Sequence, residues 1–257
     1  HVKKSGPNAG LGIPYSPWLL IEAQAFMLKD AGILKTSEAY RFDIMDLQRQ
    51  IMTNLGQAIH KEAAKAFEAG DEKGFELHSR RFLELLTDVD TLLRTLPEFN
   101  FDRWLADARS WGDTEEEKNQ FERNATALVT IWGADGDPLI FDYSWREWGG
   151  LIGKYYLKRW QKFYAMLAGC LKNGTSYTED NLPMVYGREA FRANAFYWEL
   201  EFVNTPHKVR MPVTEGDEVE IVKALYSKYL KLAEVYYQNS GEVDYIDRKN
   251  TFENLGE

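Results

Sequence analysis

The residues best suited to chemistry in this sequence are aromatic, and they gather in one segment. Residues 132–160 hold four Trp and three Tyr. Aromatic rings stack on the apolar faces of sugar rings while their N–H and O–H groups bond hydroxyls, so the segment is compatible with a carbohydrate site. A core stripe is the stronger interpretation for the helix expected from Trp145 to Lys172, because its aromatic side chains recur every three or four residues.

The loop before that helix is better placed for function. Trp132 comes just before the sequence Gly133-Ala134-Asp135-Gly136-Asp137-Pro138, which is the strongest helix break of the chain, and Tyr143 comes just after it. Loops carry function more often than helix faces do. The Asp residues of this segment do not form an EF-hand, because that motif needs regularly spaced oxygen ligands ending in a Glu and Pro138 interrupts the spacing.

The remaining residues show no pattern typical of a metal site or a catalytic nucleophile. His60, His78 and His207 have no second His or Cys at zinc-ligand spacing, so we interpret them as surface or hydrogen-bonded structural histidines. Cys170, the one cysteine, lies on an apolar helical stretch and is expected to be a buried structural thiol. No Gly-rich phosphate loop, nucleophile elbow or Cys/His pairing is present. We therefore expect no metal and no cofactor.

Two acidic pairs are candidates for catalytic carboxylates. Glu199 with Glu201, and Asp43 with Asp46, fit helix surfaces or caps better than a catalytic dyad, which places two carboxyls across a substrate from separate rigid elements. Taken alone, the residues name no reaction.

Composition limits the class of protein. The chain has 257 residues, of which 44% are hydrophobic and 28% are charged, as in ordered globular proteins. A net charge of −9 without a long block of either sign argues against nucleic acid or an anionic membrane as the main partner. The longest apolar run, 163–171, is far shorter than the roughly 20 residues that span a bilayer. The start at His1, with neither an initiator Met nor a signal-peptide pattern, leads us to expect a domain of a longer protein.

Helical periodicity dominates the chain, which predicts an all-α helical bundle of about seven or eight helices. Proline, glycine and cap residues bound the expected helices at about 17–32, 37–70, 71–97, 101–112, 113–132, 145–172, 186–203 and 217–238. The second and third of these are expected to form a hairpin. We expect an N-terminal extension or linker over 1–14, the helical domain over 15–240 and a C-terminal tail over 241–257.

Three groups of motifs match one family in order and spacing over roughly residues 40–165. The first is Arg41-Phe42-Asp43-Ile44-Met45-Asp46-Leu47-Gln48-Arg49-Gln50. The second is Trp104-Leu105-Ala106-Asp107-Ala108-Arg109, with Asn124 and Leu128-Val129-Thr130-Ile131-Trp132-Gly133. The third comprises Asp142-Tyr143, Trp148-Gly149-Gly150-Leu151-Ile152, Tyr155-Tyr156 and Arg159-Trp160. Together they resemble the C-terminal region of the alpha-N-acetylglucosaminidases, glycoside hydrolase family 89.

The resemblance implies a fold and an activity. Members of this family are retaining exo-glycosidases that release terminal alpha-linked N-acetylglucosamine (GlcNAc). They have a small N-terminal domain, a TIM barrel with two catalytic glutamates, and an all-α C-terminal domain that closes one side of the active-site cleft. This chain corresponds to the last domain, so we expect it to be inactive alone, with the barrel as its partner. The family implies a secreted, periplasmic or cell-surface enzyme in a bacterium, or a lysosomal one in an animal.

The resemblance also assigns substrate-binding residues, and none of them is catalytic. The sugar-contacting Trp of the family falls on Trp132, and its Tyr falls on Tyr143. Leu139 or Ile140 is the candidate for an apolar loop contact, and His1 is the candidate for a pocket histidine near the start of the domain.

Two other interpretations stay open from the sequence. In the first interpretation, the chain is a stand-alone helical binding or interaction module without catalytic activity. In the second, it is a purely structural domain whose aromatic residues all belong to the core. Full burial of Trp132 and Tyr143 would favour the second.

Overall fold

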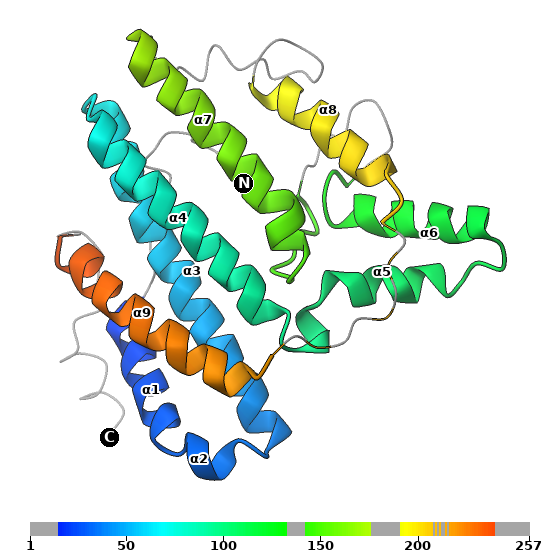
Figure 1. Cartoon of the computed structure of the whole chain (residues 1–257), viewed down its shortest axis with the longest axis horizontal. Helices are drawn as coiled ribbons and strands as arrows, with labels where there is room; N and C mark the ends of the chain where they lie inside the picture. The colour runs from blue at the N-terminus through cyan, green and yellow to red at the C-terminus, as the bar shows by residue number, and fades with distance from the viewer. Residues whose placement is uncertain are drawn as a thin grey trace, which may run out of the picture. The chain divides into compact units, whose positions relative to one another are not determined.

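The computed structural model describes residues 15–132, 142–175, 191–207, 209, 211, 214 and 216–239. This part of the chain is largely α-helical and contains no β-strand, so the all-α prediction is confirmed (Figure 1). Its α-helices are α1 (Pro17–Lys29), α2 (Ala31–Leu34), α3 (Glu38–Glu68), α4 (Glu72–Leu93), α5 (Phe101–Arg109), α6 (Glu115–Leu128), α7 (Leu157–Asn173), α8 (Phe191–Asn204) and α9 (Glu218–Asn239). A 3-10 turn covers Pro97–Phe99, and a π-helix, Ile152–Tyr156, leads into α7.

The described helices fall into two compact units. The first unit contains α1–α4 and α9, and the second runs from Leu93 through α5–α8. The expected extension over 1–14 and tail over 241–257 lie outside the described residues. No helix in the described residues is both long and apolar enough to cross a membrane.

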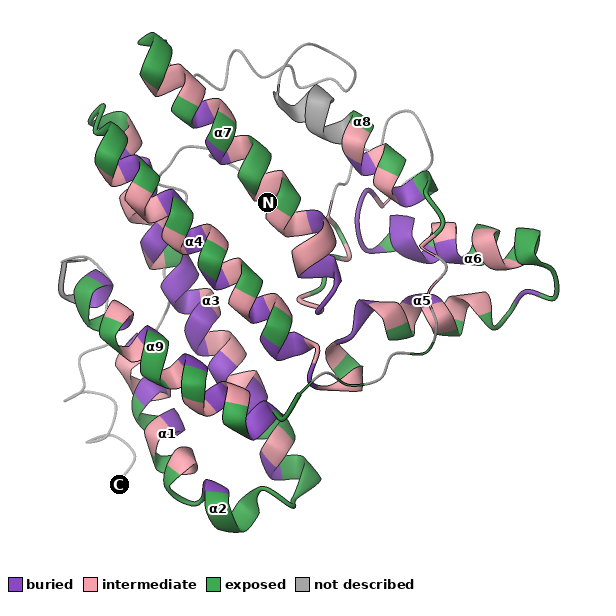
Figure 2. Ribbon diagram, in the orientation of Figure 1, coloured by how far each residue is buried: buried purple, intermediate pink, exposed green. Residues whose placement is uncertain are grey.

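Helix α3 is the centre of the first unit, where it contacts α1 and α9. Most of its middle part is coloured as buried or intermediate in Figure 2. Its fully or nearly fully buried apolar side chains are Ile44, Met45, Ile51, Met52, Leu55 and Ile59. Each contributes about 1.5–3 kcal/mol when it leaves water, which explains why the apolar stripe of the sequence specifies this helix.

Helices α3 and α4 form the expected hairpin. Asp71 lies between them, and its carboxylate accepts a hydrogen bond of 3.0 Å from a backbone N–H in the first turn of α4. Near the turn, the rings of Phe67 and Phe75 are 5.9 Å apart, and farther along His60 lies 5.8 Å from Phe82. Helix α9 joins this hairpin through polar contacts as well as apolar ones, since the Asp88 carboxylate accepts hydrogen bonds from Lys228 and Tyr229.

The second unit is built on the pair α5 and α6. Thr114 caps α6 in a capping box with Glu117: the Thr114 hydroxyl accepts from the Glu117 N–H, and the Glu117 carboxylate accepts from the Thr114 N–H. The acidic run 115–117 therefore lies in the first helical turn, where the helix dipole favours it. The buried core of this unit comprises Phe101, Leu105, Ala125, Val129, Leu151 and Tyr155.

Several helix boundaries differ from those expected, among them the end of α4, which lies at Leu93 and not at 97. Helix α6 ends at Leu128, so Trp132 lies four residues beyond it and takes a positive φ of 62°. The helix expected from Trp145 starts only after Gly149 and Gly150, because Gly149 exchanges hydrogen bonds with Phe99 and Phe101 and Gly150 has φ 89°. Gly32 does not end the first helix: α1 ends at Lys29, and α2 includes residue 32.

Candidate functional site

Trp132 and Tyr143 lie in contact in the second unit. Their ring centroids are 4.7 Å apart, and the two ring planes meet at 52°. Tyr143 is 66% exposed and Trp132 is partly exposed, so the two rings form an open aromatic surface and not a buried core contact. The other sequence-predicted site residues, His1, Leu139 and Ile140, lie outside the described residues.

Backbone hydrogen bonds bring the two rings together. The N–H of Trp132 donates to the carbonyl of Ala127 at 2.7 Å, which folds the chain back over the end of α6. The N–H of Asp142 donates to the carbonyl of Thr130 at 3.0 Å, which joins the two segments that flank residues 133–141. Trp132 and Asp142 both take positive φ values, 62° and 55°. That conformation costs a non-glycine residue about 1–2 kcal/mol, so surrounding contacts must hold it.

The side chain of Asp142 is held by a partly buried arginine. Arg159 donates from Nη1 to Asp142 Oδ2 at 2.5 Å and from Nη2 to Asp142 Oδ1 at 3.2 Å. The Tyr156 hydroxyl donates to Asp142 Oδ1 at 3.2 Å, and Arg159 Nη2 also reaches the Tyr155 hydroxyl at 2.8 Å. On its other edge, Arg159 donates from Nε to Glu199 Oε1 at 2.6 Å. We call Asp142, Arg159 and Glu199 the ionic network. It links the segment that begins at Asp142 to α7 and α8.

Burial and charge decide the protonation states in the ionic network. Burial raises the pKa of Glu199, and the charge and hydrogen bond of Arg159 oppose that rise. Burial by itself lowers the pKa of Arg159, but the neighbouring Tyr155, Glu199 and Asp142 outweigh it, and the pKa of Arg159 lies well above its usual value. Arg159 is therefore charged and is shared between two carboxylates. Glu199 is 4% exposed, so the expectation that it lies on a helix surface is wrong.

The contacts of the described histidines are typical of structural residues, and Cys170 is partly exposed. His78 Nδ1 is 2.6 Å from the Tyr236 hydroxyl, and His60 lies against Phe82, in agreement with a structural role. The His207 ring contacts Phe202 at 4.6 Å between centroids. Cys170 is half-buried, so the expectation of a buried thiol is wrong. Among the described residues, no group of three or more His, Cys, Asp or Glu side chains is arranged to hold a metal ion.

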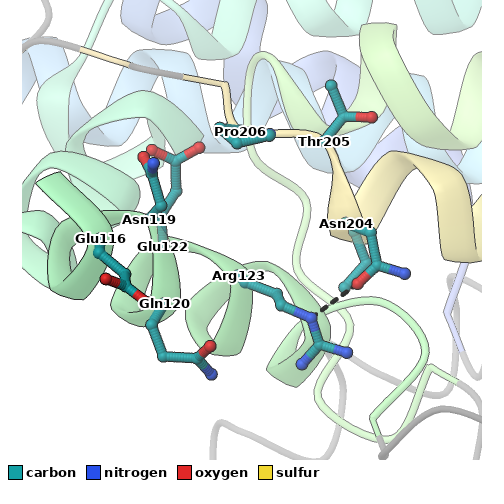
Figure 3. Close-up of a pocket in the computed structure, with 9 residues that line it drawn as sticks. Glu116, Asn119, Gln120, Glu122, Arg123, Asn204, Thr205 and Pro206 are labelled. Atoms are coloured by element: carbon teal, nitrogen blue, oxygen red, sulfur yellow. Dashed lines mark hydrogen bonds between the residues drawn. The ribbon is translucent and has the colours of Figure 1, made fainter.

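A polar pocket that the sequence did not indicate lies between α6 and the end of α8. Its volume is about 240 Å³, and Arg123 Nε donates to Asn204 Oδ1 across it at 2.6 Å (Figure 3). Beside it, the buried Glu122 carboxylate accepts hydrogen bonds from Arg109 and from the backbone N–H of His207. The lining residues are Glu116, Asn119, Gln120, Glu122, Arg123, Val203, Asn204, Thr205 and Pro206.

Comparisons with known proteins decide the family. The sequence profile of the alpha-N-acetylglucosaminidase C-terminal domain matches residues 2–228. The chain belongs to this family. Alpha-N-acetylglucosaminidase from Homo sapiens is 30% identical over 231 residues, which cover 89% of this chain and 29% of the human protein. The chain thus spans about three-tenths of the length of that relative.

Solved structures of the same family share the fold. A family 89 glycoside hydrolase from Clostridium perfringens, in complex with its substrate GlcNAc-alpha-1,4-galactose, matches with a TM-score of 0.70 and 26% identity over 87% of this chain and 26% of that chain. The family 89 enzyme from the same organism in complex with 2-acetamido-1,2-dideoxynojirmycin matches with a TM-score of 0.70 and 27% identity over 86% of this chain and 26% of that chain. The family resemblance seen in the sequence motifs is therefore confirmed.

Several of the alpha-N-acetylglucosaminidase motifs of the second unit meet at the candidate site. Asp142-Tyr143, Tyr155-Tyr156 and Arg159 come from separate motifs, and the structure joins them around the Trp132–Tyr143 pair. Sequence reasoning noted Arg159 within a motif but gave it no role, and it placed Glu199 on a surface. The sugar-binding role of Trp132 and Tyr143 stays a prediction.

Proposed function

We propose that this chain is the helical domain of an exo-acting, retaining alpha-N-acetylglucosaminidase. In this proposal the Trp132–Tyr143 pair closes one side of the cleft that binds terminal alpha-linked GlcNAc, and the two catalytic glutamates lie in a TIM barrel outside this chain. The observation that carries the proposal is an open aromatic pair, supported by the partly buried ionic network, in a domain of this family. The chain alone is then inactive.

The chemistry of the described residues supports a binding role rather than a catalytic one. Asp142 and Glu199 are the two carboxylates of the ionic network, and Arg159 is shared between them. Because the same guanidinium binds both carboxylates, neither is placed to attack a sugar carbon. Two rings inclined at 52°, by contrast, present an angled apolar surface on which a sugar ring can stack.

Steady-state kinetics of the full-length parent enzyme tests this proposal. Trp132→Ala and Tyr143→Ala each remove one ring of the pair, and we expect kcat/KM on an aryl alpha-N-acetylglucosaminide to fall about ten-fold or more. Trp111→Ala and Tyr197→Ala are matched controls, because those rings are also exposed, by 80% and 60%, and lie apart from the pair in sequence. The controls should stay within about two-fold of the parent. Unchanged kcat/KM in both Trp132→Ala and Tyr143→Ala would contradict the proposal.

Family membership also leads us to infer where the parent enzyme acts. A glycosidase that trims terminal GlcNAc from glycans works where those glycans are found, so we propose a secreted, periplasmic or cell-surface enzyme if the source is bacterial, and a lysosomal one if it is animal. Fractionation of the source cells, with alpha-N-acetylglucosaminidase activity as the readout, tests this location.

A further inference from the structure

We propose that Glu199 is a positioning residue for the aromatic pair, acting through Arg159 and Asp142 without touching the sugar. This inference rests on the proposed function, because it explains how the sugar-contacting surface keeps its shape. It assigns a role in substrate binding to a side chain on α8, which lies more than 50 residues from Tyr143 in the sequence.

The guanidinium of Arg159 transmits the constraint because it is planar and held on two edges. Its Nε edge bonds Glu199 at 2.6 Å, and its Nη1 and Nη2 atoms bond the two carboxylate oxygens of Asp142. A bidentate pair of this kind requires the guanidinium and the carboxylate to lie nearly in one plane. Glu199 therefore fixes the rotation of the Arg159 plane, and the Arg159 plane fixes the Asp142 carboxylate.

Asp142 in turn fixes the aromatic pair. It is the residue directly before Tyr143, and its φ of 55° sets the direction in which the chain enters Tyr143. Its N–H bonds the carbonyl of Thr130, two residues before Trp132. A loosened Asp142 side chain would release the strained backbone of this residue, and both rings of the pair would lose their fixed relative placement.

The burial of the network distinguishes it from an incidental surface ion pair. The side chain of Glu199 is 5% exposed and that of Arg159 is 22% exposed. A pair so shielded from water holds its geometry more strictly than an exposed one. The same unit contains a second buried pair, in which Arg109 Nη1 lies 2.8 Å from a Glu122 side chain that is 1% exposed. That pair joins α5 to α6, whereas the ionic network joins Asp142 to α7 and α8, so it provides a matched control for a purely structural role.

The test is a double-mutant cycle in the full-length parent enzyme with an aryl alpha-N-acetylglucosaminide as substrate. Glu199→Gln removes the charge at constant size, and we expect KM to rise about five-fold while kcat changes less than about two-fold. In a Tyr143→Ala background, Glu199→Gln should raise KM clearly less than in the parent, because part of its effect passes through Tyr143. Glu122→Gln should leave KM within about two-fold in both backgrounds, even if it lowers the melting temperature as much as Glu199→Gln does.

Two results would overturn the inference: KM unchanged in Glu199→Gln, or a rise in KM that persists in full in the Tyr143→Ala background. If Glu199→Gln does not fold, Arg159→Lys enters the same cycle, since it keeps the charge but loses the bidentate contact. Failure of the proposed function is recognised separately. In that case Trp132→Ala and Tyr143→Ala both leave kcat/KM unchanged, whereas failure of the inference alone leaves those two effects intact and removes only that of Glu199→Gln.

Discussion

At the scale of single residues, the two non-glycine positions with positive φ, on either side of residues 133–141, are the most informative about function. Trp132 and Asp142 are the non-glycine residues with positive φ in the described part of the chain, and each pays about 1–2 kcal/mol for that conformation. Strain of this kind persists only where surrounding contacts hold it, and it clusters at binding and catalytic sites. Here the Asp142–Arg159 ion pair and the Asp142–Thr130 hydrogen bond supply those contacts.

His60 makes a residue-scale prediction about pH. Burial lowers the pKa of His60 to about 4, whereas the unfolded chain has the ordinary value near 6.5. Between these values the unfolded state binds a proton that the folded state does not, so stability falls as the pH falls from 7 toward 4. Lowering the pH from 7 to 5 should therefore reduce the free energy of unfolding of the His60→Gln variant by about 1–2 kcal/mol less than that of the unsubstituted protein. Urea unfolding at the two pH values measures this difference. Equal losses in the two proteins would contradict this assignment.

At the scale of elements, periodicity and caps predicted most of the helices because both are local signals. Thr114 and Asp71 begin α6 and α4 as their sequence patterns indicate. The end of α6 and the start of the π-helix were missed, because they depend on contacts made far along the chain. Gly149 stops the helix expected from Trp145 by bonding Phe99 and Phe101, and no local pattern shows that bond.

Two glycines of the second unit give an element-scale prediction. A Cβ at Gly149 would lie 2.8 Å from the backbone N of Arg94 and 3.0 Å from the carbonyl carbon of Leu93. Gly149→Ala should therefore destabilise the unit by about 1–3 kcal/mol, because the backbone atoms that the new methyl group meets cannot move away without distorting the fold. Gly169 lies within α7 with nothing within 4 Å of its Cβ position, so Gly169→Ala should stabilise by about 0.5–1 kcal/mol. Thermal unfolding measures both, and a Gly149→Ala protein as stable as the parent would refute the close approach.

At the scale of the whole molecule, the sequence predicted the fold class but not the grouping of the helices. Helix α9 joins the first unit after the chain has built the second, and helical periodicity carries no information on such distant partners. The burial of Glu199 was missed for the same reason. Its helix neighbours Tyr197 and Glu201 are exposed, and only the pairing with Arg159, 40 residues earlier, shows why this one carboxylate is inside.

The aromatic pair was the part of the candidate site that the sequence could indicate, since the family motifs contain both of its residues. Its ionic support was not predictable in that way, because Glu199 belongs to no motif and pairs across two helices. The chain spans about three-tenths of the length of its human relative. The aromatic pair therefore has its proposed role within a larger enzyme.

The most direct test is a crystal structure of the full-length parent enzyme bound to a GlcNAc mimic such as 2-acetamido-1,2-dideoxynojirmycin. The measurement is the distance from the ring atoms of Trp132 and Tyr143 to the bound sugar ring. We predict contacts within about 4.5 Å for at least one of the two rings, with the catalytic carboxylates contributed by a different domain. A sugar bound more than about 10 Å from both rings, well beyond contact range, would contradict the proposed role.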